Sequence, residues 1–288
     1  GPGGNTSIKI DNKILIKKSG ALLTDAINQE IFKEVNLKNI YEYYMNSNKE
    51  GQKFDRDLSI EAPLHVMLDA KYVFHYHSIS SIIISSIYEK DILNDFLFRN
   101  EIVPIKYIRP GIELAKEVTK LNKKYKYKSF FLYNHGIIVQ GNNLKNLYKK
   151  IKEIENLFSE LIDYEKLKDI KKDIITLEQS NKRIKNPYPG FQYKKINGKY
   201  LFPDHSVFLP SFFQERTIKI SKDENITYDD DYFYFKKELS NSELIYFKTL
   251  LTIYGFIKEK KIINYINKET GHKLRDSNDE QLRIEKNK

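Results

Sequence analysis

Residues 72–77 read YVFHYH, a short run of strand-forming residues that carries two histidines. The aromatic and β-branched side chains predict a β-strand. Side chains at positions i and i+2 of a strand point to the same face, so the imidazoles of His75 and His77 can converge on one cation. The same spacing also occurs by chance on half-exposed strands, so this stretch needs support from the rest of the chain.

The segments before this strand predict a hairpin and a short helix. Residues 8–16 alternate apolar and polar side chains around the turn at residues 11–13, which predicts a β-hairpin. Residues 62–68 have the apolar spacing of a helix, with Ser59 as its expected N-cap and Glu61 in its first turn. Glu61 is either a metal ligand or general base, or a charge that favours the helix start.

The segments after this strand alternate between strand and helix patterns. Strands are expected at residues 102–108 and 130–139, and helices at residues 112–121 and 144–167, whereas residues 80–88 are expected to form either a helix or a continuation packed on the strand at 72–77. Asn134, His135 and Gly136 interrupt the apolar strand at 130–139. Because burying polar groups there costs free energy unless they are satisfied, we interpret the interruption as functional. The alternation predicts an α/β layered domain at residues 1–180.

The pattern changes after residue 180. Residues 186–190 read NPYPG, which predicts a turn and a linker. Beyond it we expect strands at residues 207–209, 217–220 and 232–235, a helix at 242–258, and a polar, highly charged tail. Residues 181–288 are therefore predicted to form a small C-terminal α+β domain.

Composition limits the classes of partner. The net charge is +10, but the basic residues are scattered and interleaved with acidic ones, which is typical of solvated helix faces and not of a nucleic-acid-binding patch. There is no apolar run of about 18 residues and no secretory signal, so we expect a cytoplasmic protein without a membrane partner. A basic surface attracts small anionic substrates. Because the chain has no cysteine, a metal site must use nitrogen and oxygen ligands.

Several short motifs, in one order over roughly the first half of the chain, resemble the class II aldolase/adducin family. They are GGNTS at residues 3–7, KKSG at 17–20, SIE at 59–61 with LH at 64–65, HYH at 75–77, YIRPG at 107–111, and NHG at 134–136 with Gly141. The fold we predict is accordingly a three-layer α/β/α class II aldolase-like domain with a mixed sheet. Residues 181–288 look like the extension of some bacterial members.

The resemblance implies roles for individual residues. His75, His77 and His135 correspond to zinc ligands, and Glu61 to a carboxylate that ligates the resting metal and acts as acid and base. Phosphate-binding positions correspond to Gly4, Asn5, Ser19, Gly20 and Ser59, in agreement with the general ability of glycine-rich turns to bind anions. Tyr107 and Arg109 are further candidates for the pocket lining.

The function that the resemblance implies is a zinc-dependent aldolase-type lyase, with manganese, iron or cobalt as alternative metals. It would cleave or form a C–C bond in a phosphorylated or otherwise anionic hydroxy-carbonyl substrate, similar to a sugar phosphate, through a metal-stabilised enediolate. A dehydratase, epimerase or decarboxylase would use the same site. The alternative of another class is a non-catalytic, adducin-like interaction protein. The family also implies a homo-oligomer, such as a tetramer.

The chain departs from the family pattern at several positions. Ile60 stands where a second hydroxyl is common, so one phosphate contact is missing. Asp204 and His205, in LFPDH at residues 201–205, either reach an active site or form a turn, and we favour the turn. His65 lies one helical turn from Glu61 and is interpreted either as a support for the site or as a core residue.

Overall fold

The computed structural model describes residues 3–46, 54–125, 127–209, 213–215 and 226–286. Within them, seven strands form one mixed sheet in the order β3-β2-β1-β4-β7-β6-β5. Its strands are β1 (Asn5–Ile10), β2 (Lys13–Lys17), β3 (Phe32–Asn36), β4 (Tyr72–Tyr76), β5 (Ile102–Ile105), β6 (Ser129–Leu132) and β7 (Gly136–Gly141). Only the β5–β6 pair is parallel, which makes the sheet mixed, as predicted.

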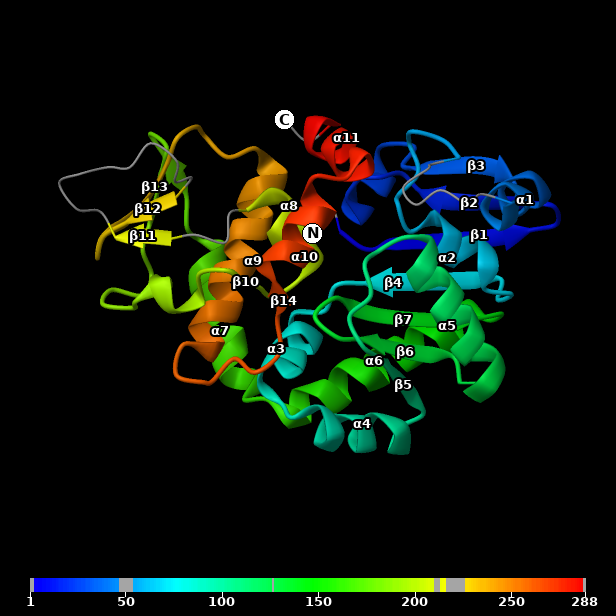
Figure 1. The fold of residues 1–288 in the computed structure, drawn as a ribbon, viewed down its shortest axis with the longest axis horizontal. Helices are drawn as coiled ribbons and strands as arrows, with labels where there is room; N and C mark the ends of the chain where they lie inside the picture. The colour runs from blue at the N-terminus through cyan, green and yellow to red at the C-terminus, as the bar shows by residue number, and fades with distance from the viewer. Residues whose placement is uncertain (1–2, 47–53, 126, 210–212, 216–225, 287–288) are drawn as a thin grey trace.

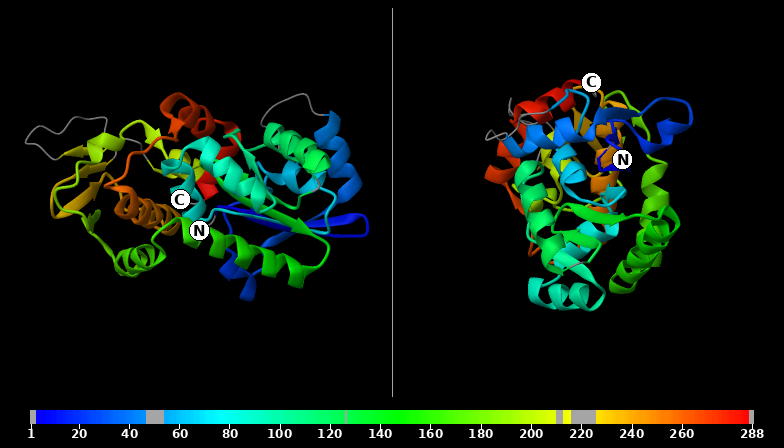
Figure 2. Two further views of the ribbon diagram at one scale, coloured as in Figure 1. Left: turned by 90° about the horizontal axis from the view of Figure 1, so that it is seen from below. Right: turned by 90° about the vertical axis from the view of Figure 1, so that its right-hand side faces the viewer.

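Helices cover both faces of this sheet, which gives the predicted three-layer α/β/α arrangement (Figures 1 and 2). One face carries α2 (Ala62–Met67) and α5 (Ile112–Tyr125), and the other carries α3 (Ile79–Ile87) and α6 (Leu144–Leu161). Helices α1 (Leu37–Asn46) and α4 (Lys90–Arg99) and the short η1 (Leu23–Ile27) complete this half of the chain. Alternate residues of β7 serve the two cores: Ile138 packs with the α2–α5 cluster, whereas Ile137 packs with the cluster that contains Phe158 of α6.

Several local predictions for this half are confirmed and others are wrong. The hairpin forms with Ile8 opposite Leu15. The single strand expected at residues 130–139 is wrong: β6 and β7 are antiparallel, and the polar interruption is the turn between them, where Asn134 has a φ of 53°. Ser59 is not the N-cap of α2, because Glu61 occupies that position and donates its backbone N–H to Ser59 Oγ at 3.2 Å.

The second half of the chain builds its own sheet and helices. After α7 (Tyr164–Ile175), the strands follow the order β11-β12-β13-β9-β8. They are β8 (Gln179–Ser180), β9 (Arg183–Lys185), β11 (Phe213–Glu215), β12 (Ile226–Tyr228) and β13 (Tyr232–Phe235), and β10 (Lys199–Tyr200) pairs separately with β14 (Ile266–Asn267). The remaining helices are η2 (Tyr193–Ile196), α8 (Pro203–Phe208), α9 (Asn241–Ile257), α10 (Lys268–Arg275) and α11 (Asn278–Lys286).

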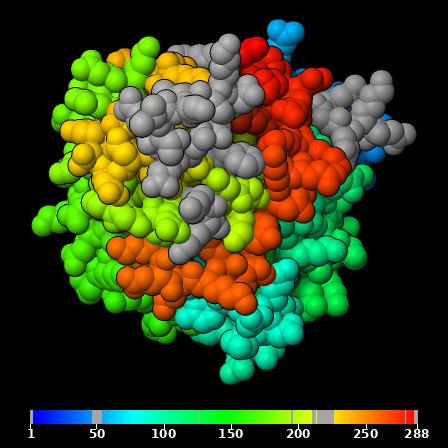
Figure 3. Space-filling model, turned by 60° about the vertical axis from the view of Figure 1, so that its left-hand side comes forward, coloured from blue at the N-terminus to red at the C-terminus, as the bar shows by residue number. Residues whose placement is uncertain are grey.

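The two halves share one hydrophobic core. Phe247 and Leu250 of α9 belong to the same cluster of buried side chains as Ile82 of α3. The segment after α9 also binds the first half directly, since Asn264 Nδ2 donates to the carbonyl of Tyr88 at 2.8 Å. In Figure 3 the orange part of the second half lies directly against the cyan part of the first half.

The second half differs from the sequence predictions more than the first. Residues 207–209 were predicted to be a strand, but most of them lie in α8, which Pro203 begins at a position where a missing N–H costs nothing. The strand at 217–220 lies outside the described residues. Asn186 in the NPYPG segment is 3% exposed and accepts a hydrogen bond from Tyr193, so this turn is packed. The charged tail folds into α10 and α11. Among the described residues no helix has the length and hydrophobicity to cross a bilayer.

Candidate metal centre

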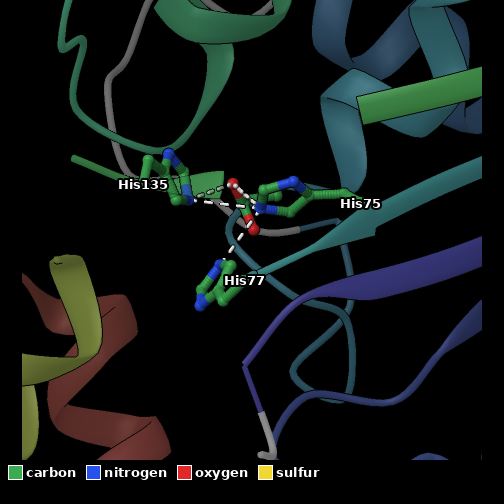
Figure 4. Close-up of side chains that lie close together, drawn as sticks. His75, His77 and His135 are labelled. Carbon is green, nitrogen blue, oxygen red and sulfur yellow. Dashed lines mark hydrogen bonds and ion pairs between the residues drawn. The ribbon is translucent and has the colours of Figure 1, made fainter. Parts of the chain in front are cut away.

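The pairing of β4 with β7 brings the three candidate histidines to one end of the sheet. Tyr76 lies opposite Ile137, so His77, just after β4, and His135, just before β7, emerge at the same place. His75 is one pleat earlier on β4 and points to the same side (Figure 4). Glu61 lies at the N-terminus of α2, one of the two helices that cover one face of the sheet. The four side chains therefore arrive from three separate parts of the chain.

The four side chains meet closely. The Nε2 atom of His75 lies 3.2 Å from that of His135 and 3.1 Å from that of His77. Glu61 Oε1 lies 3.4 Å from His75 Nε2 and 3.3 Å from His135 Nε2. All four candidate ligand atoms lie within 4.8 Å of one another. His75, His135 and Glu61 are almost fully buried, so the cluster is largely shielded from water.

Hydrogen bonds on the outer side of two rings fix which nitrogen faces the centre. His75 Nδ1 lies 3.0 Å from the carbonyl of Ile137, and His77 Nδ1 lies 2.7 Å from Asp204 Oδ2. Both partners only accept, so both Nδ1 atoms carry a proton, and in the neutral rings both Nε2 atoms present lone pairs to the centre. Burial lowers the pKa of His75 to about 3, which keeps its imidazole neutral at pH 7.

This donor set fits a cation. When both rings are neutral, the Nε2 lone pairs of His75 and His77 lie 3.1 Å apart and repel each other. A tetrahedral ion with bonds of about 2.0–2.1 Å holds its ligand atoms about 3.3–3.4 Å apart, close to the four separations of 3.1–3.4 Å given above. Three imidazoles and one carboxylate also match the nitrogen and oxygen ligands that zinc and similar divalent metals accept.

Asn5 connects Glu61 to a second buried network. Its Nδ2 donates to Glu61 Oε2 at 3.0 Å, so its Oδ1 is left to accept from His65 Nε2. His65 Nδ1 then accepts from Ser7 Oγ at 2.8 Å, and burial lowers the pKa of His65 to about 3, in agreement with a neutral ring. His65 is thus fully buried and also connected to Glu61 through Asn5, and Asn5 both lines the cavity and donates to the carboxylate.

A small cavity adjoins Glu61, His77 and His135. It measures about 20 Å³, room for about one water molecule. The residues predicted to bind phosphate all line it, namely Gly4, Asn5, Ser19, Gly20 and Ser59. Gly4 has a φ of 71°, and a Cβ there would lie 2.7 Å from the carbonyl oxygen of His75, so only glycine fits this turn.

Lys17 is a cavity residue to which we assigned no role from the sequence. Its side chain is buried, and its Nζ donates to the carbonyl of Ala21 at 2.7 Å. Burial, together with the nearby Arg283, lowers the pKa of Lys17 to about 8. The KKSG motif contained this residue, but nothing in the sequence distinguished it from the many exposed lysines.

Tyr107 and Arg109 are half-buried and do not line this cavity, although Pro110 does. The Tyr107 hydroxyl is buried and has no hydrogen-bond partner among the described residues. Burial raises the pKa of Tyr107, the positive charge of Arg109 lowers it, and the charges of Glu280 and Glu61 raise it again.

The remaining wall of the cavity comes from the second half of the chain. Pro203, Asp204, Glu280 and Arg283 line it, and Figure 4 shows the yellow-green and red ribbons of this region on the His77 side of the cluster. Burial by itself raises the pKa of Asp204, but Arg283 and His77 more than offset this and hold it below its usual range. The turn that we favoured for Asp204 is therefore wrong: Asp204 lies in α8 and reaches the site. His205 points away and accepts from the backbone N–H of Leu201 at 3.2 Å.

Fold and site together define an α/β protein with a buried centre of three histidines and one glutamate. Residues 1–162 match the model of the Class II Aldolase and Adducin N-terminal domain, and the chain belongs to this family. It is similar to an L-fuculose phosphate aldolase of Methanocaldococcus jannaschii, with 26% identity over 164 residues, which are 54% of this chain and 81% of that protein.

Solved structures resemble the same half of the chain. One is the N-terminal class II aldolase domain of a conserved protein from Thermoplasma acidophilum, with a TM-score of 0.46 and 23% identity. The match covers 56% of this chain and 84% of the Thermoplasma chain. Another is an L-fuculose-1-phosphate aldolase from Thermus thermophilus, with a TM-score of 0.40 and 18% identity. The match covers 58% of this chain and 86% of the Thermus chain.

Proposed function

We propose that the protein is a metal-dependent lyase of the aldolase type, with zinc as the first candidate metal. The observation that carries the proposal is the convergence of three imidazole nitrogens and a Glu61 oxygen, all within 4.8 Å of one another, with separations of 3.1–3.4 Å around His75 Nε2 and between Glu61 and His135. His75, His77, His135 and Glu61 would hold the ion. When bound, it would supply a Lewis acid that draws electron density from the oxygens of a hydroxy-carbonyl substrate.

Glu61 is the proposed acid and base. Its Oε2 is held by Asn5, whereas its Oε1 accepts no hydrogen bond from the described residues and faces the imidazoles. One oxygen is therefore anchored, and the other would either hold the ion or, when it does not, take a proton from the substrate and return it. The burial of the carboxylate removes competing water, which strengthens its electrostatic interactions.

The proposed substrate is small, anionic and similar to a sugar phosphate. Two glycine turns, the Ser19 and Ser59 hydroxyls and Lys17 surround the cavity and offer donors to an anion. Ile60 supplies no hydroxyl, so the anion would be held by fewer side chains than the resemblance implies. Because the space is about 20 Å³, a substrate of this size requires part of the lining to move outward.

The same residues would also serve a dehydratase, an epimerase or a decarboxylase. The class of substrate separates these activities: a panel of sugar phosphates, hydroxy acids and keto acids, incubated with metal-loaded protein, would report C–C cleavage, loss of water, inversion or release of CO₂. We expect C–C cleavage of a phosphorylated substrate. Inversion or loss of water without C–C cleavage would reassign the reaction while leaving the site intact.

The proposed catalytic role is tested with Glu61→Gln. This variant keeps three imidazoles, so it should retain bound metal while losing turnover. Turnover at the wild-type rate would remove Glu61 from the mechanism. Metal-free wild-type protein that gains neither affinity for anionic ligands nor activity on adding metal would favour the adducin-like interaction protein instead. We also propose a homo-oligomer, which light scattering of the purified protein would test.

A further inference from the structure

His77 differs from the other two histidines in how its outer nitrogen is held. His75 Nδ1 donates within the sheet, to the carbonyl of Ile137. His77 lies just beyond the end of β4, where no strand neighbour is available, and its Nδ1 donates to Asp204 Oδ2 of α8 at 2.7 Å. Asp204 lies on the far side of the ring from Nε2, and is not among the four residues whose ligand atoms cluster. Asp204 would therefore contact His77, a candidate ligand, and not the ion that His77 would hold.

The carboxylate of Asp204 is itself fixed on both oxygens. It is 1% exposed, and its Oδ1 pairs with the guanidinium of Arg283 in α11. The same Arg283 donates to the hydroxyl of Tyr246 at 2.8 Å and to Glu280 Oε2 at 3.2 Å. A buried carboxylate is costly unless it is paired and hydrogen-bonded, and here each oxygen has a charged or N–H donor. Residues from three helices of the second half thus hold one carboxylate against one ring.

The N-terminal glycine turn leaves room for this pair. A Cβ on Gly3 would overlap Asp204 Oδ2 and would lie 2.7 Å from His77 Nδ1. No side chain larger than hydrogen fits there unless the hydrogen bond between Asp204 and His77 gives way. The absence of a side chain at Gly3, near the start of the chain, therefore allows Asp204 of α8 to reach His77.

We propose that Asp204 is a positioning residue for His77, and that Arg283 anchors it, so that the C-terminal helices α8 and α11 form part of the metal centre of the same chain. Asp204 and Arg283 lie outside residues 1–162, which match the family model. Asp204 keeps the proton of His77 on Nδ1 and the lone pair of Nε2 directed at the centre, as carboxylates bound to ligating histidines commonly do. The inference rests on the proposed metal site.

The test compares Asp204→Asn with wild type and with Ser206→Ala. Asparagine keeps the shape but places an N–H₂ group against either His77 or Arg283. Ser206 lies two residues along α8, is fully buried and donates to the carbonyl of Pro203, so its truncation perturbs the same helix without touching His77. Zinc affinity is measured by competition with a chelating dye, and the visible spectrum of the cobalt-substituted protein reports ligand geometry.

We expect zinc to bind Asp204→Asn about 10–100-fold more weakly than wild type, with an altered cobalt spectrum, while Ser206→Ala matches wild type in both. A folded Asp204→Asn protein with unchanged affinity and spectrum would overturn the inference and leave the proposed function standing. A wild-type protein that binds no metal would reject both. Gly3→Ala, which keeps every buried charge, provides the same comparison if Asp204→Asn does not fold: unchanged zinc affinity there also overturns the inference.

Discussion

We expect the substitution Glu61→Gln to stabilise the metal-free protein and to destabilise the zinc-loaded protein. In the metal-free protein at pH 8, the Oε1 of Glu61 faces the Nε2 lone pair of His75 at 3.4 Å, so two acceptors face each other. A glutamine fits the same space. Its oxygen can accept from Asn5 Nδ2, which now donates to Oε2 at 3.0 Å, and its N–H₂ group can donate to one imidazole.

The size of the effect follows from the unpaired group. Supplying a donor to a buried, unsatisfied acceptor removes a penalty of about 1–3 kcal/mol. For 288 residues the entropy of unfolding is about 0.6 kcal/mol/K. Metal-free Glu61→Gln should therefore melt about 2–5 °C above metal-free wild type at pH 8. In saturating zinc the order should reverse, because a neutral amide is a poorer ligand than a carboxylate.

The assay is thermal unfolding, followed by circular dichroism, of chelator-treated and zinc-loaded protein. Glu155→Gln is a suitable control, because Glu155 is a partly buried carboxylate that accepts from Ser78 at 3.0 Å and does not line the cavity. Its difference from wild type should not depend on zinc. If metal-free Glu61→Gln melts below wild type, Glu61 Oε1 and the imidazole Nε2 do not face each other as two acceptors. The assignment of lone pairs to the centre is then wrong.

Three further outcomes are expected. Removing the metal with a chelator should lower the melting temperature by about 5 °C relative to zinc at 100 times its Kd, where binding contributes about 2.7 kcal/mol; an unchanged temperature would contradict a structural metal contribution. Asn5→Asp should lower the free energy of unfolding by about 1–3 kcal/mol in urea titrations, because it replaces the donor to Glu61 with a like charge; equal midpoints would mean that the Asn5 bond contributes nothing. Affinity for inorganic phosphate should fall as pH rises through about 8, because Lys17 loses its proton there, and Lys17→Met should bind phosphate more weakly with a flatter pH profile; the same profile in both would exclude Lys17 from anion binding.

The sequence predicted the parts of the site that depend on local geometry. The spacing of His75 and His77 required only that residues 72–77 form a strand, which they nearly all do. Placing His135 with them requires the pairing of β4 with β7, and no local pattern contains that information. Motif order supplied it instead, because the resemblance to a family carries the topology of the sheet. The turn at residues 134–136 was mistaken for a break inside one strand, since both flanking segments are apolar and buried.

The contribution of the second half could not be predicted in the same way. The sequence favours a turn at Asp204 over a place in the site, and it does not separate a turn from a helix start, because a Pro-Asp pair is typical of both. Arg283 stood in a tail that was predicted only to be polar and charged. Its contact with Asp204 joins residues 79 positions apart, and burial of this arginine depends on Tyr246 and Phe208, which pack only once α8, α9 and α11 have formed. Such contacts leave no periodic signal.

X-ray absorption at the zinc edge of the loaded protein tests the central claim most directly. We predict one ion per chain, with nitrogen and oxygen ligands at about 2.0–2.1 Å and the outer scattering of three imidazole rings, which His135→Ala reduces to two. An ion coordinated by oxygen alone, or a spectrum that His135→Ala leaves unchanged, would contradict the account.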